Sequence, residues 1–402
     1  MSSTQAEPNA KASGPYHDRN FQIICLISLI AVLGVSSVTP AFPKLAQALK
    51  IAPQNVGLLV AAFTLPSLLF GPAIGVLADR LGRKQVLVPA LFLFAIAGSA
   101  CALAPNMPVL LGLRFLQGIG AAPLLSLGLT LIGDFYTGDR RTAAMGYNAS
   151  VSSVGTASYP TLGGALAGFG WYYPFLLPLA AIPIGLLVLF ALRNPERREQ
   201  QNLRTYLGNA GRLLKNRQLL GLFVASAANF VFLYGACVTY LPQLMADSFQ
   251  ASALEIGLLL SSVSVAIAFT AVQLSKLARR FSTPGLIRAS FGFYAAALLI
   301  VPFMPSLWLL LIPTTIFGIG LGIGMPSIQT QLAELAPREY LATVMAINGT
   351  FFGLGQTIGP LITGFAFGVG GLNAVFFVAA GLSLATLVFL QTCNCVGPSR
   401  SR

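Results

Sequence analysis

The sequence predicts an all-α membrane protein with twelve transmembrane helices, arranged as two parallel six-helix repeats. The composition is the first reason: of 402 residues, 55% are hydrophobic and 9% are charged, whereas soluble domains carry about 25% charged residues. The second reason is a series of long apolar runs. The third is an internal duplication, in which the two halves match at a constant offset of 200 residues.

The apolar runs are long enough to cross a membrane, because a helix needs about 20 mostly apolar residues to span the hydrocarbon. Their least distinct boundaries are at Met304–Pro305 and between Gly168 and Trp171. The twelve runs lie near 21–41, 55–78, 85–104, 108–133, 143–168, 171–192, 219–242, 255–276, 287–304, 307–330, 341–367 and 371–391.

The duplication needs no gap. Identical residues recur at Gly57 and Gly257, Arg80 and Arg280, Gly118 and Gly318, Met145 and Met345, Asn148 and Asn348, Pro160 and Pro360, and Gly164 and Gly364. Each repeat holds six runs, and because six is even, both repeats begin and end on the same side. Parallel repeats are one of the two main layouts of secondary transporters, with the substrate site near mid-membrane between the halves.

Basic residues give the expected orientation. The net charge is +13, and with a cytoplasmic N-terminus all but three of the 24 Lys and Arg residues fall on the cytoplasmic side. The exceptions are Lys44 and Lys50, which lie outside, and Arg114, which lies in a span. This positive-inside bias places both termini in the cytoplasm. It also argues against a nucleic-acid partner, because the charges are dispersed over short loops.

The predicted domain organisation follows from the spans. We expect six-helix bundles at 20–193 and 219–392, a cytoplasmic linker at 194–218, and cytoplasmic tails at 1–19 and 393–402. The linker is rich in Lys and Arg, and it is either an amphipathic helix on the inner leaflet or a mobile connection. The first tail is polar and does not resemble a cleavable signal.

The loop after the second run carries a dense group of charges and glycines, from Gly75 to Lys84. Gly75 permits close helix approach, and Gly82 permits a tight turn. Asp79 lies at a helix C-terminus, where the dipole is already negative, so it needs a positive partner. Arg83 is the natural one, and the N-terminus of another helix is the alternative. We expect Asp79 and Arg83 to form a gating latch, whereas Lys84 is a topology signal.

Asp134 is a second acid at a helix C-terminus, at the end of the fourth run. Arg83 is able to serve both acids. We therefore predict an Asp79–Arg83–Asp134 cluster on the cytoplasmic face that holds the outward-open state shut.

The fourth run contains Arg114, followed by Gln117, Gly118 and Gly120. A charge inside a span costs about 2.5–3.5 kcal/mol on insertion scales, so Arg114 should face a cavity or a partner. Gln117 lies three residues on and shares its face. Two interpretations stay open: a functional Arg, or a structural Arg bonded to backbone carbonyls.

The fifth run contains a glycine–proline pattern at Gly155, Pro160, Gly163 and Gly164. Pro160 removes one helix hydrogen bond and kinks the span, and the paired glycines allow tight packing. Its copy in the second half keeps the proline at Pro360.

Together these three motifs resemble those of the major facilitator superfamily, and the likeness covers about residues 20–392. The loop resembles G-x-L-a-D-r-x-G-r-k, and the fourth run resembles R-x-x-Q-G-x-G-a-a. The fifth resembles the exporter-associated g-x-x-x-G-P-x-x-G-G, with Tyr159 in place of the glycine before the proline. The resemblance implies the major facilitator fold and a drug:proton antiporter-like exporter, and in that family the Arg at position 114 is tied to proton coupling.

The second repeat has lost these charges. It carries Arg279, Thr283, Thr314 and Phe317 at the positions that match Asp79, Arg83, Arg114 and Gln117. We therefore expect the gating and coupling groups, Asp79, Arg83, Arg114 and Asp134, to act from the first repeat alone.

No Asp or Glu lies well inside any predicted span, so Arg114 is the only charge expected there, and it favours anionic or polar substrates. The uncharged candidates for the substrate cavity are equally consistent with helix–helix hydrogen bonding. They are Gln117, Asn148, Asn229, Tyr234, Asn348 and Gln356, and also Tyr240, Gln243 and Gln329.

The expected function is proton-coupled efflux of small amphipathic compounds or drugs by alternating access, by a monomer in the bacterial inner membrane. The alternatives are an exporter of one metabolite, such as a sugar, amino acid or siderophore, and a membrane sensor on a transporter fold. We expect neither an enzyme nor a cofactor. The chain has no phosphate-binding loop, which argues against transport driven by ATP. We also expect no metal site. Cys393 and Cys395 read as a plain tail rather than a metal or palmitoylation site.

Overall fold

The computed structural model describes residues 18–193, 213–337 and 340–392. Most of the first tail, most of the linker with its predicted amphipathic helix, and the tail with Cys393 and Cys395 lie outside the described residues. The described residues form helices and no strand.

The N-terminal half is built from seven α-helices, several of which are joined by short 3₁₀ segments. They are α1 (Arg19–Ser36), α2 (Phe42–Ala48), α3 (Gly57–Leu81), α4 (Arg83–Ala100), α5 (Met107–Phe135), α6 (Gly138–Phe169) and α7 (Ala181–Ala191). A 3₁₀ segment, η5 (Tyr173–Ala180), leads directly into α7. Asn106 caps α5 by accepting a hydrogen bond from the amide of Val109, as short polar side chains do at helix starts.

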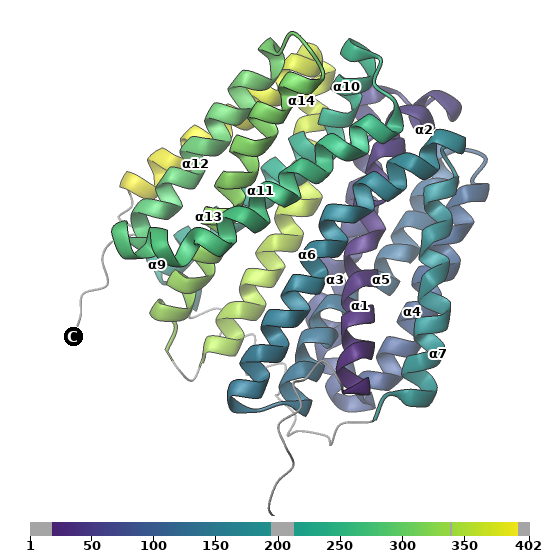
Figure 1. Cartoon of the computed structure of the whole chain (residues 1–402), viewed down its shortest axis with the longest axis vertical. Helices are drawn as coiled ribbons and strands as arrows, with labels where there is room; N and C mark the ends of the chain where they lie inside the picture. The colour runs from purple at the N-terminus through teal and green to yellow at the C-terminus, as the bar shows by residue number, and fades with distance from the viewer. Residues whose placement is uncertain (1–17, 194–212, 338–339, 393–402) are drawn as a thin grey trace, which may run out of the picture.

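The C-terminal half repeats this arrangement (Figure 1). Its helices are α9 (Arg217–Phe230), η6 (Val231–Tyr240), α10 (Leu241–Phe249), α11 (Ala253–Arg280), α12 (Thr283–Ile300), α13 (Leu311–Leu335) and α14 (Leu341–Thr392). Ser252 and Glu255 form a capping box at the start of α11, so this acid completes a helix end.

Ten helices in the described residues are long and apolar enough to cross a membrane. Two features explain the difference from the predicted twelve. α14 is two helices joined at Gly370 and Gly371, where Gly371 has a φ of 68°, a conformation that favours glycine. α6 is 32 residues long but rich in Gly, Ser and Thr, and it is absent from those ten. A helix therefore lies at each of the twelve predicted runs.

The seventh span departs from α-helical geometry over Val231–Tyr240, which forms a π-helix. The Thr239 hydroxyl accordingly donates to the carbonyl of Tyr234, five residues earlier, at 2.6 Å. π-helical turns are rare and occur often at functional sites. This segment reaches across the molecule, because Tyr234 and Val238 pack against the core of the N-terminal half.

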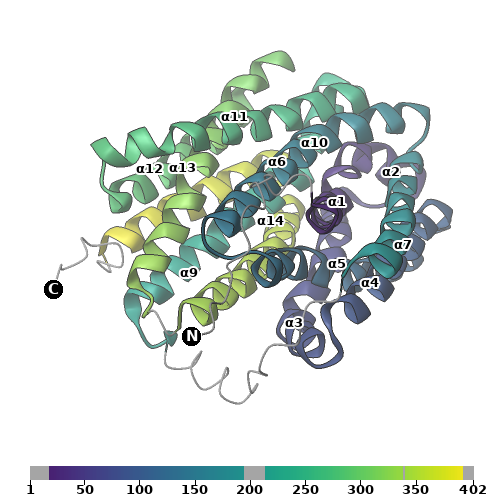
Figure 2. The ribbon, with the colours of Figure 1, turned by 60° about the horizontal axis from the view of Figure 1, so that its bottom comes forward.

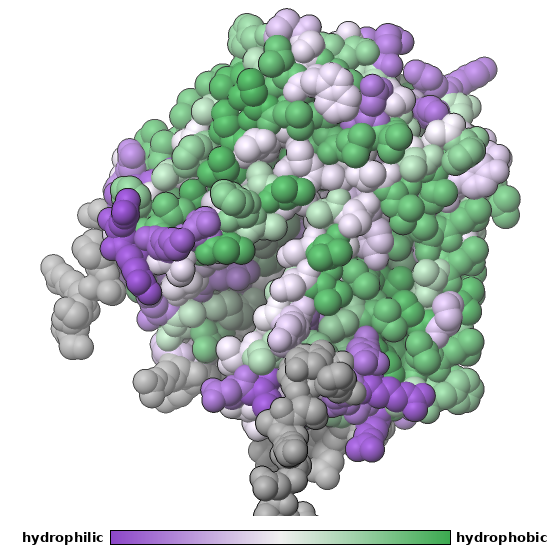
Figure 3. Space-filling view, in the orientation of Figure 1, coloured by the Kyte–Doolittle hydropathy of each residue, from purple (hydrophilic) through white to green (hydrophobic). Residues whose placement is uncertain are grey.

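Each half buries its own core. One large apolar cluster runs from Leu213 to Leu390, entirely within the C-terminal half, and two others lie in the N-terminal half. The outer surface is also apolar: Phe190 is 80% exposed and Phe365 is 77% exposed. Apolar exposure on this scale fits a surface turned to lipid rather than water. Figure 3 shows the hydrophobic band with hydrophilic residues gathered at its ends.

We call the two ends of the bundle the basic end and the far end. The basic end carries Arg80, Arg83, Lys84, Arg140 and Arg141, and the far end carries α2 and the start of α11. The Lys84 ammonium bonds the carbonyl of Leu192 at 3.2 Å, which ties the end of the sixth span to the start of α4. Figure 2 brings the basic end forward.

At the same end Tyr136 donates a hydrogen bond to the carboxylate of Asp18, the N-cap of α1. Burial, and then this hydrogen bond, raise the pKa of Tyr136. The phenol is therefore held in its neutral, donating form, and it joins the end of α5 to the start of α1.

Candidate functional site

The two halves meet along two antiparallel helix pairs, α3 with α14 and α6 with α11. Near the far end both pairs are in backbone contact. A Cβ built on Gly57 would lie 2.6 Å from the carbonyl oxygen of Pro360, and one built on Gly257 would also strike the carbonyl of Pro160. These four residues are the repeat partners of one another, so the duplication builds the same contact twice.

The α3–α14 contact continues only to about the middle of the membrane. The hydroxyls of Thr64 and Thr357 lie 3.0 Å apart, and a Cβ on Gly353 would still meet Leu68 at 3.6 Å. Beyond that point a Cβ on Gly71 or on Gly349 would meet no atom within 4 Å. The two helices therefore separate toward the basic end.

The α6–α11 pair behaves in the same way. The hydroxyls of Thr161 and Ser261 lie 2.8 Å apart, and Ser264 donates to the carbonyl of Thr156 at 3.3 Å. Nearer the basic end Gly146 again faces open space. The surface is hollowed between the halves at this end (Figure 3). The molecule is thus closed at the far end and open at the basic end.

Gly75 differs from the prediction. The sequence predicts close helix approach there, but a Cβ on Gly75 would meet no atom within 4 Å. The reason is its position on the part of α3 that has separated from α14, so any close contact of Gly75 belongs to a conformation in which the basic end is closed.

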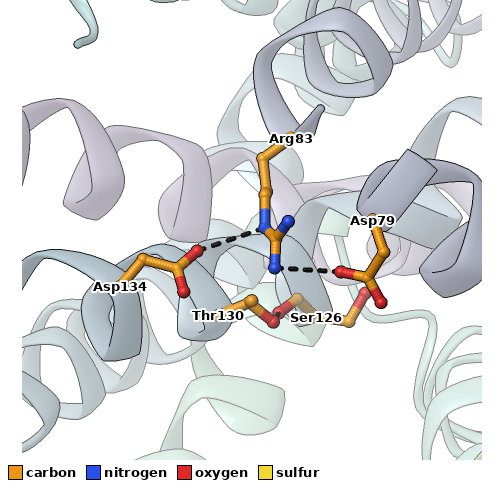
Figure 4. A network of polar contacts seen from close by, with 5 residues as sticks. All are labelled: Asp79, Arg83, Ser126, Thr130 and Asp134. Atoms are coloured by element: carbon orange, nitrogen blue, oxygen red, sulfur yellow. Dashed lines mark hydrogen bonds and ion pairs between the residues drawn. The ribbon is translucent and has the colours of Figure 1, made fainter. Parts of the chain in front are cut away.

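Asp79, Arg83 and Asp134 come together at the basic end (Figure 4). Arg83 Nη2 lies 2.9 Å from Asp79 Oδ1, and Arg83 Nε lies 3.1 Å from Asp134 Oδ2. The second contact is electrostatic, because its atoms do not meet hydrogen-bond geometry. The side chains of Arg83 and Asp134 are 6% and 5% exposed, whereas Asp79 is 40% exposed.

Local geometry places Arg83 between the acids. α3 and α4 are joined by Gly82 alone, with a φ of 111°, which is the tight turn that the sequence predicts. Arg83 is therefore the first residue of α4, while both acids lie at helix C-termini, where an added negative charge needs a cation.

The cluster differs from the prediction in what it connects. All three residues belong to the N-terminal half, and their ion pairs are formed while the basic end is open. They join α3, α4 and α5 and do not bridge the halves. In this conformation the cluster is therefore not a latch between the halves that holds the basic end shut. A gating role for it remains a prediction.

Arg114 is sealed inside the N-terminal half, with 1% of the residue exposed. Its guanidinium donates to the carbonyls of Gly34 on α1, at 2.9 Å, and Leu59 on α3, at 3.3 Å. It also donates to Gln117 at 2.9 Å and lies 4.5 Å from the ring centroid of Phe63. This is the carbonyl-bonded arrangement that the sequence left as one of two interpretations.

Neither Arg114 nor Gln117 is accessible to a substrate in this conformation. Gln117 is fully buried, and its amide nitrogen lies where a Cβ on Gly98 would be. An anionic substrate therefore cannot reach Arg114 in this conformation, so the predicted attraction does not operate here. The two donors that remain without a partner, Arg114 Nη2 and Gln117 Nε2, are enclosed within the bundle.

The glycines of these motifs make close helix contacts. A Cβ on Gly118 would strike the backbone of Phe63 on α3. On α6, Gly155 faces Leu29 of α1, Gly163 faces the carbonyl of Ser37, and Gly164 faces that of Ala253 on α11. One side of α6, the fifth span, therefore packs closely against its own half, and another side packs closely against the C-terminal half.

The predicted substrate residues divide into two groups. Asn148, Asn229 and Asn348 are each no more than 2% exposed, and each has a buried amide oxygen without a partner. Tyr234 and Gln356 are partly exposed. Of the further candidates, Tyr240 bonds the carbonyl of Gln54 across the far end, at 3.1 Å, and Gln243 bonds Asp247 at 2.9 Å.

The threonine pair Thr64 and Thr357 was missed by sequence reasoning. Nothing in its local sequence is distinctive, although the repeat pairs Thr64 with Ser264, which makes the equivalent cross-half contact. The described residues contain no group of three or more His, Cys, Asp or Glu side chains that could hold a metal ion.

Comparison with known sequences decides the family. The profile of the Major Facilitator Superfamily matches residues 24–244 and again residues 223–393. The chain belongs to this superfamily. The two matches correspond to the two repeats, and the described helices have the major facilitator fold.

Several bacterial relatives of this superfamily member cover nearly its whole length. Multidrug resistance protein 1 of Bacillus subtilis is 27% identical over 90% of this chain and 93% of its own. The bacillibactin exporter of the same organism is 26% identical over 92% and 95%. Quinolone resistance protein NorA of Staphylococcus aureus is 25% identical over 89% and 92%.

Solved structures show the same fold. A point mutant of the nucleoside transporter NupG superposes with a TM-score of 0.80 at 15% identity, over 94% of this chain and all of that one. A bacterial homologue of the human lysosomal transporter Spinster, in an inward-facing and unoccupied conformation, gives a TM-score of 0.76 at 20% identity, over 95% and 96%.

Proposed function

We propose that this chain is a secondary active transporter that exports small amphipathic compounds or drugs in exchange for protons. One observation carries the proposal: two repeats of a superfamily member are closed against each other at the far end and open at the basic end, through contacts that recur at the repeat offset. Such a molecule alternates by rocking one half against the other around a central site.

The orientation belongs to the same proposal. With the basic end in the cytoplasm, as the positive-inside rule favours, both termini are cytoplasmic and the structure corresponds to an inward-facing state. We place the protein in the bacterial inner membrane as a monomer, with bundles at 20–193 and 219–392. It acts on its substrate by moving it, and not as an enzyme.

The direction and the drug class are supported by relatives named for multidrug and quinolone resistance. The relative named as a bacillibactin exporter favours a second candidate, export of one siderophore-like metabolite. Asp79, Arg83 and Arg114 are assigned to gating and coupling because the second repeat lacks the charges that match them. Asp134 is added to them because its carboxylate lies 3.1 Å from Arg83 Nε.

The test is transport by purified protein in proteoliposomes. A panel of aromatic drugs and siderophores is loaded, and a pH gradient is imposed across the membrane. Proton-coupled export predicts uphill movement of at least one compound, which stops when an ionophore collapses the gradient. Movement that persists without the gradient would contradict proton coupling, and no movement of any compound would contradict the function itself.

A further inference from the structure

The point where the two halves part has an aromatic wall. Phe230, at the end of α9, lies 4.6 Å from Phe352 of α14 and 6.0 Å from Tyr234, centroid to centroid. Phe352 and Tyr234 are partly exposed, and Phe352 follows Gly349 by less than one turn, just where α14 leaves α3. These rings therefore border the apex of the open space rather than the interior of one half.

The opposite pair of helices offers hydroxyls. Thr156 and Thr161 of α6 and Ser261 and Ser264 of α11 are all partly exposed. Their hydrogen bonds join the two halves up to the same depth. Because a hydroxyl has one donor and two acceptor positions, each keeps capacity for another hydrogen bond. The apex is thus aromatic on one side and hydroxylated on the other.

None of the acids or basic residues in the described helices is placed at this apex. Every described acid lies within three residues of a helix end: Asp18, Asp79, Asp134, Asp139, Asp247, Glu255 and Glu334. Arg114 alone among the described basic residues sits at mid-span, and it is 1% exposed with three hydrogen bonds of its own.

Moving an unpaired charge from water into this apex costs a large amount of free energy. Moving an isolated ion out of water costs far more than moving a neutral hydrogen-bonding group, and the cost is recovered only beside an opposite charge. Aromatic rings, in contrast, stack favourably on other rings.

We infer that the apex selects uncharged aromatic compounds with a hydrogen-bonding edge, bound between the Phe230–Tyr234–Phe352 wall and the hydroxyls of α6 and α11. This inference rests on the proposed function, and it assigns that transporter a substrate class. Gln356 is the position at which an added acid should change the charge preference, because it is partly exposed and lies one turn from Phe352 on the same face of α14.

The experiment measures competition with the export of a panel compound in proteoliposomes. The competitors are three methoxycoumarin derivatives that share one ring and differ in one side group: a neutral amide, a permanently cationic trimethylammonium and a carboxylate. The neutral amide is expected to inhibit export at a concentration at least about tenfold lower than either charged derivative. Equal inhibition by the cation or the carboxylate would overturn the inference while leaving the proposed transport function in place.

Variants then locate the preference. Gln356→Glu is expected to lower the inhibitory concentration of the cation at least about tenfold, whereas Gln85→Glu, which adds the same acid at an exposed position of the basic end, leaves it unchanged. Phe352→Leu is expected to weaken inhibition by the neutral amide about tenfold. If Gln356→Glu folds, as judged by its unfolding temperature, and the cation competes no better, the site is not at this apex. If Gln356→Glu does not fold, the inference is still tested by Phe352→Leu and by the competition of the three derivatives on the wild-type protein.

Discussion

At the scale of single residues, burial separates the two acids that share Arg83. Asp134 is 5% exposed and Asp79 is 40% exposed. Exposed ion pairs are worth about 0–1 kcal/mol, whereas removing one partner of a buried pair costs about 3–5 kcal/mol. Breaking the contact of Arg83 with Asp134 should therefore cost much more stability than breaking its contact with Asp79.

This difference gives a first prediction. Arg83→Ala removes the cation that lies beside the buried Asp134 carboxylate, so we expect it to lower stability by about 3–5 kcal/mol. Asp79→Asn is expected to change stability by at most about 1 kcal/mol. The measurement is thermal unfolding in detergent at neutral pH. The control is Arg83→Ala with Asp134→Asn, which removes both charges of the buried pair and should recover most of the loss. Equal losses for the two single variants would contradict the assignment.

Arg114 gives a second prediction. Lysine keeps the charge but cannot reach three acceptors on three sides, and hydrogen bonds between membrane helices are worth about 0.6–1.7 kcal/mol each. Arg114→Lys should therefore lower the unfolding temperature and the transport rate together, at a loss of about 1–2 kcal/mol. Gln117→Leu, which removes one of the three acceptors, should lose less. A normal unfolding temperature with abolished transport would instead support a coupling role.

At the scale of elements, the sequence predicts most of what the structure contains. The break between the last two spans is predicted near 367–371 and lies at Gly370 and Gly371, because glycine there marks a real left-handed turn. The π-helix at Val231–Tyr240 and the short α2 were not predicted. Both depend on tertiary packing. For the π-helix in particular, a hydropathy pattern does not distinguish π-helical from α-helical backbone. The openness around Gly75 was also missed, because it belongs to one conformation and not to the sequence.

α3 offers a third prediction, because it carries one glycine in the closed contact and one in the open space. Gly57→Leu would clash with the carbonyl of Pro360, so it should open the far end. A Cβ on Gly75 meets no atom within 4 Å here, so Gly75→Leu should leave the far end closed and obstruct closure of the basic end. Both should slow transport at least about tenfold.

Spin labels across each end distinguish the two variants. Distances measured across the far end should lengthen in Gly57→Leu and stay unchanged in Gly75→Leu. Gly112, which also faces open space but lies on α5, provides a matched control as Gly112→Leu, and neither distance should change there. A shift in the same direction for Gly57→Leu and Gly75→Leu would contradict the proposed rocking of α3 against α14.

At the scale of the whole molecule, the two repeats are alike in the contacts that join them but differ in their charged residues. The far-end contacts of Gly57 and Gly257 are equivalent, but Arg83 and Arg114 have Thr283 and Thr314 as their counterparts. The aromatic wall is likewise confined to one side of the apex. We therefore propose that both halves share the motion, while Arg83 and Arg114 act from the first half alone.

The last prediction tests whether α3 and α14 must separate at mid-membrane for transport. Thr64 and Thr357 lie on opposite halves with their hydroxyl oxygens 3.0 Å apart, so the pair Thr64→Cys and Thr357→Cys should bring two sulfur atoms close enough to form a disulfide on oxidation. Made in a background whose native cysteines are replaced, the oxidised double variant should lose transport almost completely, because the halves cannot part at this point. Reduction should restore it, and each single variant should be insensitive to oxidant. Transport that continues through the intact disulfide would show that the substrate crosses without separation of α3 from α14, which alternating access between these halves does not allow.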